Sequence, residues 1–170
     1  GKGAAVRTGV LASSGTRVLF MDADLATPLS EFAKLERAIE DGADFAFGSR
    51  ASPDSNILVR QHPLREAMGR AFNVLVRTLT IGEYKDTQCG FKMMRRSVAD
   101  DVFSQATVDR FAFDVELLML AHGRYRLAEV PVAWRHVDES KVSPIRDAPQ
   151  MLLDLLRLRL LVALRRWNKL

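Results

Sequence analysis

Two aspartates stand one residue apart directly after a short apolar run, and this spacing suits the binding of a cation. The run VLFM at 18–21 leads into Asp22 and Asp24. Such a run is typical of a buried strand, and open α/β sheets bind ligands at strand ends. Two close carboxylates repel each other unless a cation neutralises them, and Mg²⁺ or Mn²⁺ carrying a diphosphate would do so. The alternative is that both aspartates only cap the following helix.

Two further segments place carboxylates where elements are expected to begin. The segment DTQCGFK at 86–92 sets Asp86 beside a glycine turn that also carries Lys92, and it predicts either a catalytic region or a polar turn before a strand. The segment FDVELL at 113–118 puts Asp114 and Glu116 in the first turn of an expected helix. The helix dipole favours acidic residues there, so the alternatives are helix stabilisation and a carboxylate aimed at an acceptor.

A group of cations suits an anionic ligand. Arg135, Ser140 and Lys141 share one polar segment with His136, and Arg50 follows a predicted strand. Arginine offers phosphate a planar fork and lysine a point charge, so these residues are candidates for phosphate binding; the alternative is a solvated basic surface. His136 has no histidine or cysteine partner at the spacing of zinc ligands, so we do not interpret it as one.

The elements that must position these residues alternate between helix and strand. Helices are expected over 4–12, 27–41, 63–81, 97–105 and 113–122 and over the leucine-rich C-terminal segment, and strands over 17–21, 44–48, 91–94 and 129–134. Thr27 offers a cap for the second helix, with Pro28 at its first position, and Pro131 indicates an edge strand. Residues 51–62, 82–90 and 135–146 are expected to be loops. This alternation predicts one α/β domain with a helical tail.

Composition narrows the class further. The chain has 170 residues, of which 48% are hydrophobic and 27% charged, as in a globular rather than a disordered protein. Cys89 is the single cysteine, so no internal disulfide can form. From Arg124 onward there are ten basic and five acidic side chains, which favours an anionic partner. No nucleic-acid motif is present, so the expected partner is a phosphate or an acidic membrane surface.

Both ends of the sequence carry predictions. Helix-like sequence begins at once after Gly1 and Lys2, although a parallel α/β sheet should begin with a strand, so we expect a domain that lacks its first βαβ portion. At the other end, arginines interrupt the leucine-rich helix from Met151 to Trp167 too often for it to span a bilayer. A helix lying on an anionic membrane surface fits this pattern, and packing on its own domain is the alternative.

Taken in order, these segments resemble family 2 glycosyltransferases with the GT-A fold, and within them the dolichyl-phosphate β-glucosyltransferase branch. The resemblance rests on GKGAAVR at 1–7, MDADLATP at 21–28, GSR at 48–50, DTQCGFK at 86–92, FDVELL at 113–118 and RH with SKV at 135–142. It covers essentially the whole chain. It implies an N-terminally incomplete GT-A domain over 1–146 with a mostly parallel sheet flanked by helices, and a C-terminal amphipathic helix over 147–170.

The resemblance also implies roles for the candidate residues. Asp22 and Asp24 would hold Mg²⁺ or Mn²⁺ together with the donor's ribose-diphosphate, with water or phosphate completing the shell because Ala26 offers no side-chain ligand. The donor or acceptor phosphates would be bound by the cations and the hydroxyl, namely Lys2, Arg50, Arg135, Ser140 and Lys141. Asp86 and Asp114 would lie in the catalytic region. They need not remove a proton, because a lipid monophosphate is mostly a dianion at neutral pH.

The function implied is inverting transfer of a sugar, glucose from UDP-glucose being the expected donor, to a dolichyl or polyprenyl phosphate. The protein would be cytoplasmic and peripherally attached to the cytosolic face of a membrane, with no nucleic-acid partner. Two alternatives stay open at this point. One is a truncated, inactive relative that binds a membrane or a partner. The other is a haloacid-dehalogenase-type phosphatase, whose threonine four positions after the first aspartate is replaced here by Ala26.

Overall fold

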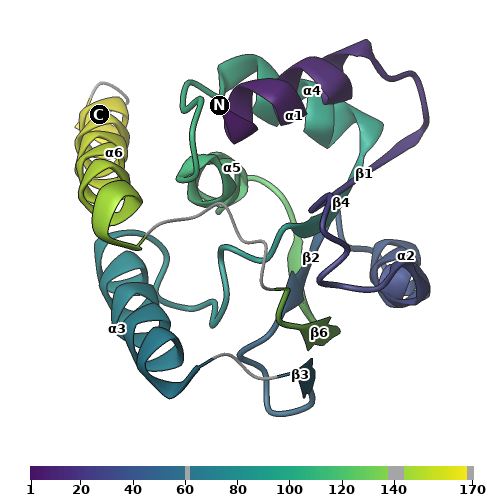
Figure 1. The fold of residues 1–170 in the computed structure, drawn as a ribbon. Helices are drawn as coiled ribbons and strands as arrows, with labels where there is room; N and C mark the ends of the chain where they lie inside the picture. Colours follow the sequence, from purple (N-terminus) through teal and green to yellow (C-terminus); the bar gives the residue numbers. More distant parts are fainter. Residues whose placement is uncertain (60–61, 138–143, 168–170) are drawn as a thin grey trace.

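The computed structural model describes residues 1–59, 62–137 and 144–167. Figure 1 shows the elements in chain order. They are α1 (Lys2–Ala12), β1 (Arg17–Met21), the 3₁₀ turn η1 (Leu29–Glu31), α2 (Phe32–Glu40), β2 (Phe45–Ser49), β3 (Asn56–Val59), α3 (Pro63–Leu79), β4 (Phe91–Arg95), α4 (Arg96–Gln105), α5 (Phe113–Ala121), β5 (Leu127–Pro131), β6 (Ala133–Arg135) and α6 (Pro144–Trp167). The predicted α/β class is confirmed.

The main sheet has four strands in the order β1-β4-β2-β5. β4 runs antiparallel to both β1 and β2, whereas β2 and β5 are parallel. Three of the four strands point the same way and β4 is reversed, so two of the three strand pairings are antiparallel and the expected mostly parallel sheet is met in strand direction only. Alternation of helix and strand could not reveal this reversal, which arises because the loop before β4 returns to the end of β1: the Asp22 N–H donates to the Gly90 carbonyl at 2.8 Å.

Each face of the sheet carries its own apolar core, because successive side chains on a strand point to opposite faces. One face, with Val18, Phe20 and Met94 among its buried residues, packs against α4 and α5. The other face, with Met93 and Phe91, packs against Leu35 and Ile39 of α2 and the neighbouring side chains. Figure 1 shows the resulting layers, with α2 on one side of the sheet and α1, α4 and α5 on the other.

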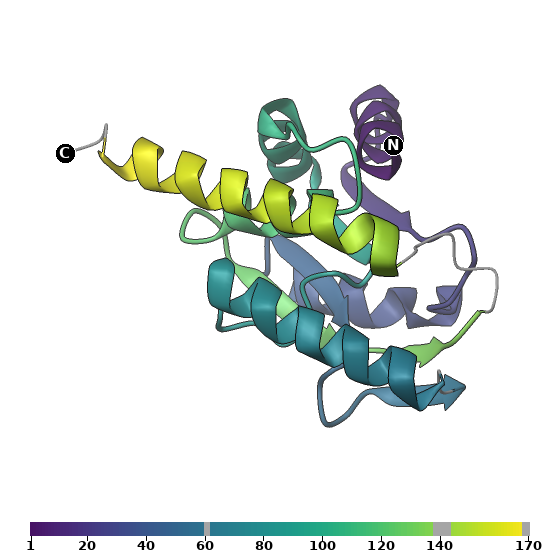
Figure 2. The same cartoon turned by 60° about the vertical axis from the view of Figure 1, so that its left-hand side comes forward.

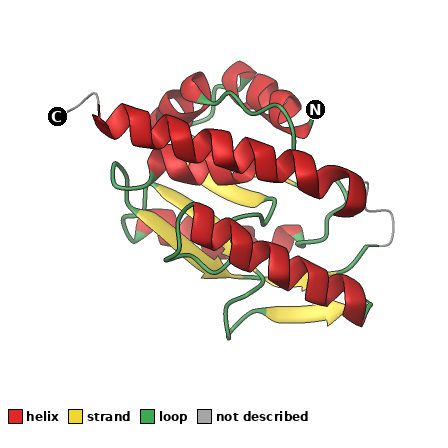
Figure 3. Ribbon diagram, turned by 90° about the vertical axis from the view of Figure 1, so that its left-hand side faces the viewer, coloured by secondary structure: helices red, strands yellow, loops and turns green. Residues whose placement is uncertain are grey.

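Helices α3 and α6 form a further layer outside α5. They lie side by side in Figures 2 and 3, and Val76 of α3 and Leu155 of α6, both fully buried, meet Ala112 and Val115 at α5. The predicted C-terminal helix is thus present, and one side of it packs on its own domain. Its first residue, Pro144, lies three residues before the expected start of the C-terminal segment.

Three elements differ from the sequence prediction. Residues 56–59, expected to be a loop, form β3, which pairs with β6 in a small second sheet. The expected strand over 129–134 divides there: Val132 separates β5, an edge strand as Pro131 indicated, from β6. The helix expected from residue 27 begins only at Phe32 after a 3₁₀ turn, and Thr27 does not cap it but is buried with its hydroxyl 3.9 Å from the Cys89 sulfur.

Candidate active site

The segment from Asp22 to Ala26 forms a tight turn at the end of β1. The Leu25 N–H donates to the Asp22 carbonyl at 3.1 Å, and the Ala26 N–H donates to Asp24 Oδ1 at 3.0 Å. Leu25 has a φ of 54°, the one non-glycine residue with positive φ in the described chain, and backbone strain of this kind concentrates at functional sites. Because neither η1 nor α2 has a side-chain cap, the helix-capping alternative for Asp22 and Asp24 is wrong.

Gly90 gives the Asp22 carboxylate its place. A Cβ added to Gly90 would lie 2.3 Å from the carboxylate carbon and from both of its oxygens. Real Cβ atoms essentially never approach other atoms so closely, so only glycine allows β4 to begin against this side chain. The turn at 22–26 and the glycine of 86–92 therefore meet at one edge of the sheet. The segment GSR at 48–50 lies beside them, since a Cβ on Gly48 would lie 3.1 Å from the Cys89 sulfur.

Lys2 joins two of the predicted carboxylates. Its Nζ lies 2.6 Å from Asp22 Oδ1 and 3.6 Å from Asp114 Oδ2. Burial alone would lower the pKa of Lys2, but the carboxylates of Asp114 and Asp22 outweigh it, and the net pKa is raised. Lys2 therefore stays charged, and it supplies a positive charge between Asp22 and Asp114.

Helix α1 presents Lys2 to the site by close packing against the loop before α5. A Cβ on Gly1 would lie 2.3 Å from the Asp109 carbonyl oxygen, and one on Gly3 would lie 2.3 Å from the Val108 carbonyl oxygen. The Ala4 N–H donates to the same Asp109 carbonyl at 3.2 Å. The two glycines of the GKG segment thus allow the backbone contact that fixes the helix end carrying Lys2.

Asp114 is buried and paired on both sides. Its Oδ1 lies 2.6 Å from Nζ of Lys92, which is fully buried and also donates to the Cys89 carbonyl at 2.5 Å. The side chain of Asp114 is only 4% exposed, which suits it to positioning the two lysines. Glu116, its neighbour on α5, instead accepts hydrogen bonds from the backbone of Thr107 and Val108 and holds the loop before the helix.

Arg50 and Asp86 form the second charged pair of the site. Asp86 Oδ2 accepts from Arg50 Nε at 2.7 Å, and Oδ1 accepts from Nη2 at 2.9 Å, a two-point ion pair. Asp86 is 2% exposed; burial alone would raise its pKa, but Arg50 outweighs this effect and lowers it. Both carboxylate oxygens are occupied, so in this arrangement Asp86 orients Arg50. Glu129 fixes the loop in turn by accepting from the Lys85 and Asp86 N–H groups.

The arginine is held on its other side by an aromatic ring. The guanidinium carbon of Arg50 lies 5.7 Å from the ring centroid of Trp134 on β6, within the range of a cation–π interaction. Burial alone would lower the pKa of Arg50, but Asp86 outweighs burial and raises it, and Asp22 adds a smaller attraction. The exposed Arg135 follows Trp134, and its N–H donates to the Ala26 carbonyl at 2.9 Å, which joins β6 to the aspartate turn.

The structure thus brings together most of the residues that the sequence singled out. Lys2, Asp22, Asp24, Arg50, Asp86 and Asp114 meet at one edge of the main sheet, with the backbone of Arg135 beside them. Ser140 and Lys141 lie outside the described residues. Glu129 and Trp134 were not predicted as contributors, and Lys92 was noted in its segment without a role. A lysine inside the apolar run FKMM was a signal for Lys92, because a charge there needs a buried partner.

The donor set is compatible with a hard divalent cation bound together with a phosphate. Within the described ranges no three histidine, cysteine, aspartate or glutamate side chains are grouped as a metal site. Mg²⁺, however, is usually held by one or two carboxylates plus substrate phosphates. Asp22 already faces one cation, the Lys2 ammonium, and Asp24 is exposed at the same turn. The residues present therefore fit a metal that arrives with its diphosphate.

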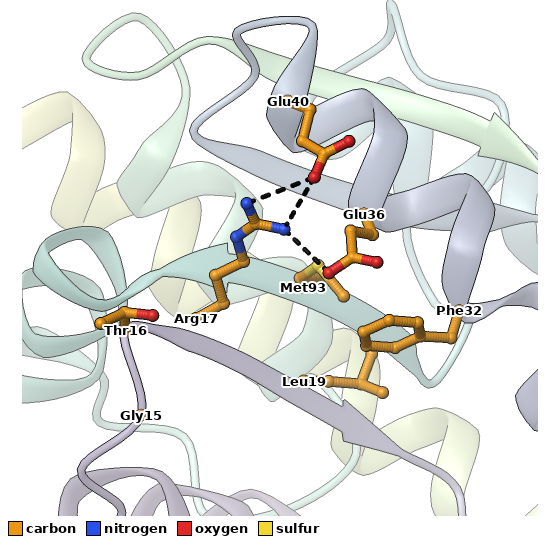
Figure 4. A pocket seen from close by; sticks show the side chains of 8 residues that line it. All are labelled: Gly15, Thr16, Arg17, Leu19, Phe32, Glu36, Glu40 and Met93. Carbon is orange, nitrogen blue, oxygen red and sulfur yellow. Dashed lines mark hydrogen bonds and ion pairs between the residues drawn. The ribbon is translucent and has the colours of Figure 1, made fainter.

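A separate pocket of about 510 Å³ lies at the opposite end of β1. Figure 4 shows Arg17 bonded to Glu36 and Glu40 across it, above an apolar floor that includes Met93. A five-residue strand spans roughly 16 Å, which separates Arg17 at its start from Asp22 beyond its end. The ion pairs already occupy this pocket's charged groups, so we place the active site at the aspartate turn.

The comparisons with solved structures identify the class of fold. Glucosyl-3-phosphoglycerate synthase from Mycobacterium tuberculosis, solved in complex with UDP, superposes with a TM-score of 0.63 at 19% identity over 94% of this chain and 55% of that one. Mannosyl-3-phosphoglycerate synthase from Rubrobacter xylanophilus gives a TM-score of 0.53 at 18% identity, over 100% of this chain and 53% of that one. The fold is that of the GT-A glycosyltransferases.

Sequence comparison then gives the family. Residues 1–103 match the model of glycosyl transferase family 2, and the chain belongs to this family. It is 37% identical to dolichyl-phosphate beta-glucosyltransferase of Dictyostelium discoideum, over 99% of this chain and 53% of the relative. It is 38% identical to the human protein of the same name, over 94% of this chain and 52% of the relative. The chain thus spans about half the length of these curated relatives.

The family assignment settles one alternative and leaves another. Membership of a glycosyltransferase family argues against the haloacid-dehalogenase-type phosphatase. The inactive relative stays a hypothesis, to be decided by assay.

Among the described residues, no helix is both long and apolar enough to cross a membrane.

Proposed function

We propose that this protein transfers glucose from UDP-glucose to a dolichyl or polyprenyl phosphate, with inversion at the sugar, at the cytosolic face of a membrane. The observation that carries the proposal is the convergence of the Asp22–Asp24 turn with Lys2 and the Arg50–Asp86 pair at one sheet edge. These groups provide carboxylates for a metal-bound diphosphate and cations for a second phosphate. The names of the related proteins support both the sugar and the acceptor.

In the proposed reaction, an oxygen of the lipid phosphate attacks the anomeric carbon while the bond from that carbon to the diphosphate breaks. A single displacement inverts the configuration. A metal held by Asp22 and Asp24, Mg²⁺ or Mn²⁺, would supply charge stabilisation for the leaving diphosphate. The lipid phosphate is already mostly a dianion at neutral pH, so the protein's main task is to bring two anionic groups together.

Arg50 is the best-placed group for that task. Asp86 holds it at two points and Trp134 supports its face, so the side chain is ordered before a phosphate arrives. Arg135, which follows Trp134 on β6, and Ser140 and Lys141 farther along the sequence, are proposed as further phosphate contacts. Asp86 and Asp114 are proposed as positioning residues for Arg50 and Lys2, since their buried oxygens are occupied by these cations.

The outer helices support attachment to a membrane surface. Helix α6 exposes several large apolar side chains, namely Leu153, Leu156, Leu160 and Leu161, and α3 exposes Met68, Val74 and Leu75. Arg157 and Arg159 are exposed among the leucines of α6. Apolar side chains interspersed with arginines favour a surface of anionic lipids, and a polyprenyl phosphate presents its phosphate at such an interface.

The direct test is transfer of radiolabel from UDP-glucose to a polyprenyl phosphate in the presence of Mg²⁺ or Mn²⁺, with protein expressed from the whole open reading frame that contains these residues. We expect label in the lipid phase. Chelation by EDTA and the Asp24→Asn variant should each abolish it. Asp41→Asn, which removes an exposed carboxylate at the end of α2, is the matched control and should retain activity.

Other donors complete the test. GDP-mannose and UDP-N-acetylglucosamine should give little or no transfer if glucose is the natural sugar. Transfer from one of these donors alone would correct the sugar, and no transfer from any would favour the inactive relative. Activity that survives both EDTA and Asp24→Asn would remove the metal from the mechanism.

A further inference from the structure

Four charged side chains of alternating sign run from the aspartate turn into the core. Asp22 Oδ1 lies 2.6 Å from Lys2 Nζ, Lys2 Nζ lies 3.6 Å from Asp114 Oδ2, and Asp114 Oδ1 lies 2.6 Å from Lys92 Nζ. Exposure falls along the series, from 35% for Asp22 and 31% for Lys2 to 4% for Asp114 and none for Lys92. The outer pair can therefore rearrange, whereas the inner pair is fixed.

Lys2 is placed unequally between its two carboxylates. Its ammonium is in direct contact with Asp22 and a full ångström farther from Asp114. Asp22 is also one of the two carboxylates proposed to hold the metal. A divalent cation binds a carboxylate oxygen at about 2.1 Å, so a metal and the Lys2 ammonium cannot share the Asp22 oxygens without strong repulsion between the two positive charges.

We propose that Lys2 is a positioning residue that competes with the divalent cation for Asp22. The ammonium holds the carboxylate while the metal is absent, and it moves to Asp114 when the metal binds. This inference rests on the proposed function, from which it takes the metal. The flexible lysine stem permits the shift, while the packing of Gly1 and Gly3 against residues 108–110 keeps α1 in place.

Asp114 is suited to receive the lysine because Lys92 already fixes it. Its Oδ1 is bound to the buried Lys92, and its Oδ2 faces Lys2. Two lysines and two aspartates are balanced in charge without a metal. When the metal neutralises Asp22, Lys2 keeps a carboxylate partner and is not left as a half-buried free charge. Lys2 thereby lowers the metal affinity of the empty site without leaving either carboxylate unpaired.

The test measures Mn²⁺ binding by protein expressed from the whole open reading frame that contains these residues, from the loss of the electron paramagnetic resonance signal of the free ion. We expect Lys2→Met to bind Mn²⁺ about fivefold more tightly than the wild type, the order of magnitude for one half-exposed ion pair. Lys2→Arg keeps the charge and should stay near the wild type. Lys34→Met removes a lysine that lies 2.6 Å from Glu31 on the other side of the sheet, and it should leave Mn²⁺ affinity unchanged.

A second readout follows the lysine itself. Mg²⁺ should shift the ¹⁵Nζ resonance of Lys2 in the wild type, a signal identified by its absence from Lys2→Met, and this shift should vanish in Asp24→Asn. Circular dichroism establishes that each variant is folded.

Unchanged or weaker Mn²⁺ binding by Lys2→Met would overturn the inference, as would an equal gain in Lys34→Met or absence of binding by both the wild type and Lys2→Met. If Lys2→Met binds Mn²⁺ more tightly but the wild type transfers no sugar, the proposed function is refuted and the competition between Lys2 and the metal stands.

Discussion

At the scale of single residues, Gly90 is the position where one methyl group should disturb the site most. Gly90→Ala places a Cβ 2.3 Å from the Asp22 carboxylate, so either this side chain or the start of β4 must move. We expect a loss of about 1–3 kcal/mol in the free energy of unfolding and weaker metal binding. Denaturant unfolding and Mn²⁺ titration measure the two effects.

Gly9→Ala is the matched control for this substitution. A Cβ on Gly9, in the middle of α1, would meet nothing within 4 Å. Alanine is the better helix former, so this variant should gain up to about 1 kcal/mol of stability. Equal stability and equal Mn²⁺ binding of the two variants would contradict the need for glycine at position 90.

Lys92 is the buried charge whose removal should destabilise the fold most. Lys92→Met leaves Asp114 buried beside an apolar side chain, and breaking a buried ion pair from one side costs about 3–5 kcal/mol. Chemical denaturation measures this cost. Adding Asp114→Asn should restore part of the loss, because no unpaired carboxylate then remains in the core. A single variant that loses less than about 1 kcal/mol would contradict the buried pair.

Asp86 predicts how stability depends on acid pH. Arg50 lowers its folded-state pKa below the ordinary value of 3.8, so the pair stabilises the fold fully above that value and loses its contribution as the pH falls toward the lower folded-state pKa. Asp86→Asn should therefore be less stable than the wild type at pH 7, and the difference should shrink below pH 4. Urea unfolding of both proteins across this pH range tests the prediction. A difference in the free energy of unfolding that does not change with pH would exclude the Asp86 charge as its cause.

At the scale of elements, the contact between α3 and α6 depends on a few buried side chains. Leu155→Ala removes a fully buried side chain that meets Val76 and the start of α5, and we expect a loss of about 2–5 kcal/mol. Leu160→Ala, on the same helix but 60% exposed, should change stability by less than about 0.5 kcal/mol. Thermal unfolding of both variants would show whether α6 is part of the cooperative fold, and equal effects would mean that it is not.

The elements also show what the sequence could and could not predict. Buried strands such as Phe91–Arg95 were foreseen because their apolar runs are unambiguous. Strand β3 was missed because its residues 56–59 are mostly exposed and pair only with the short β6. The start of α2 was misplaced because Thr27 faces the Cys89 sulfur in the interior. A tertiary contact decided that boundary, and local sequence carries no sign of it.

The same limit applies to the candidate site. Asp22, Asp24, Arg50, Asp86 and Asp114 were all recognised from their segments. Their pairing was not, because Arg50 and Asp86 are 36 residues apart and Lys92 and Asp114 are 22 apart. The pairing changes the expected roles. Asp86 and Asp114 were considered for catalysis, but Asp86 holds Arg50 in place and Asp114 holds Lys2 and Lys92.

At the scale of the whole molecule, the outer helices predict where a membrane would contact the protein. Replacing Leu156 and Leu160 by glutamate should weaken binding to vesicles that contain anionic lipid by about tenfold or more, since each leucine contributes on the order of 1.5 kcal/mol when buried. Leu11→Glu replaces an exposed leucine on α1 and should bind like the wild type. Co-sedimentation with vesicles measures the binding of both variants. An equal loss of vesicle binding in the two variants would exclude α6 as the membrane contact.

The position of β4 in the sheet has a consequence for the order in which the protein is made. β1 and β2 are separated by β4, so neither has its shared sheet partner until the ribosome has synthesised residues 91–95. Before then, two apolar strands present unpaired edges, the condition under which nascent chains aggregate or bind chaperones. Lys2 and Asp22 are synthesised before Gly90 and Asp114, yet they reach their places only after those two residues have been added.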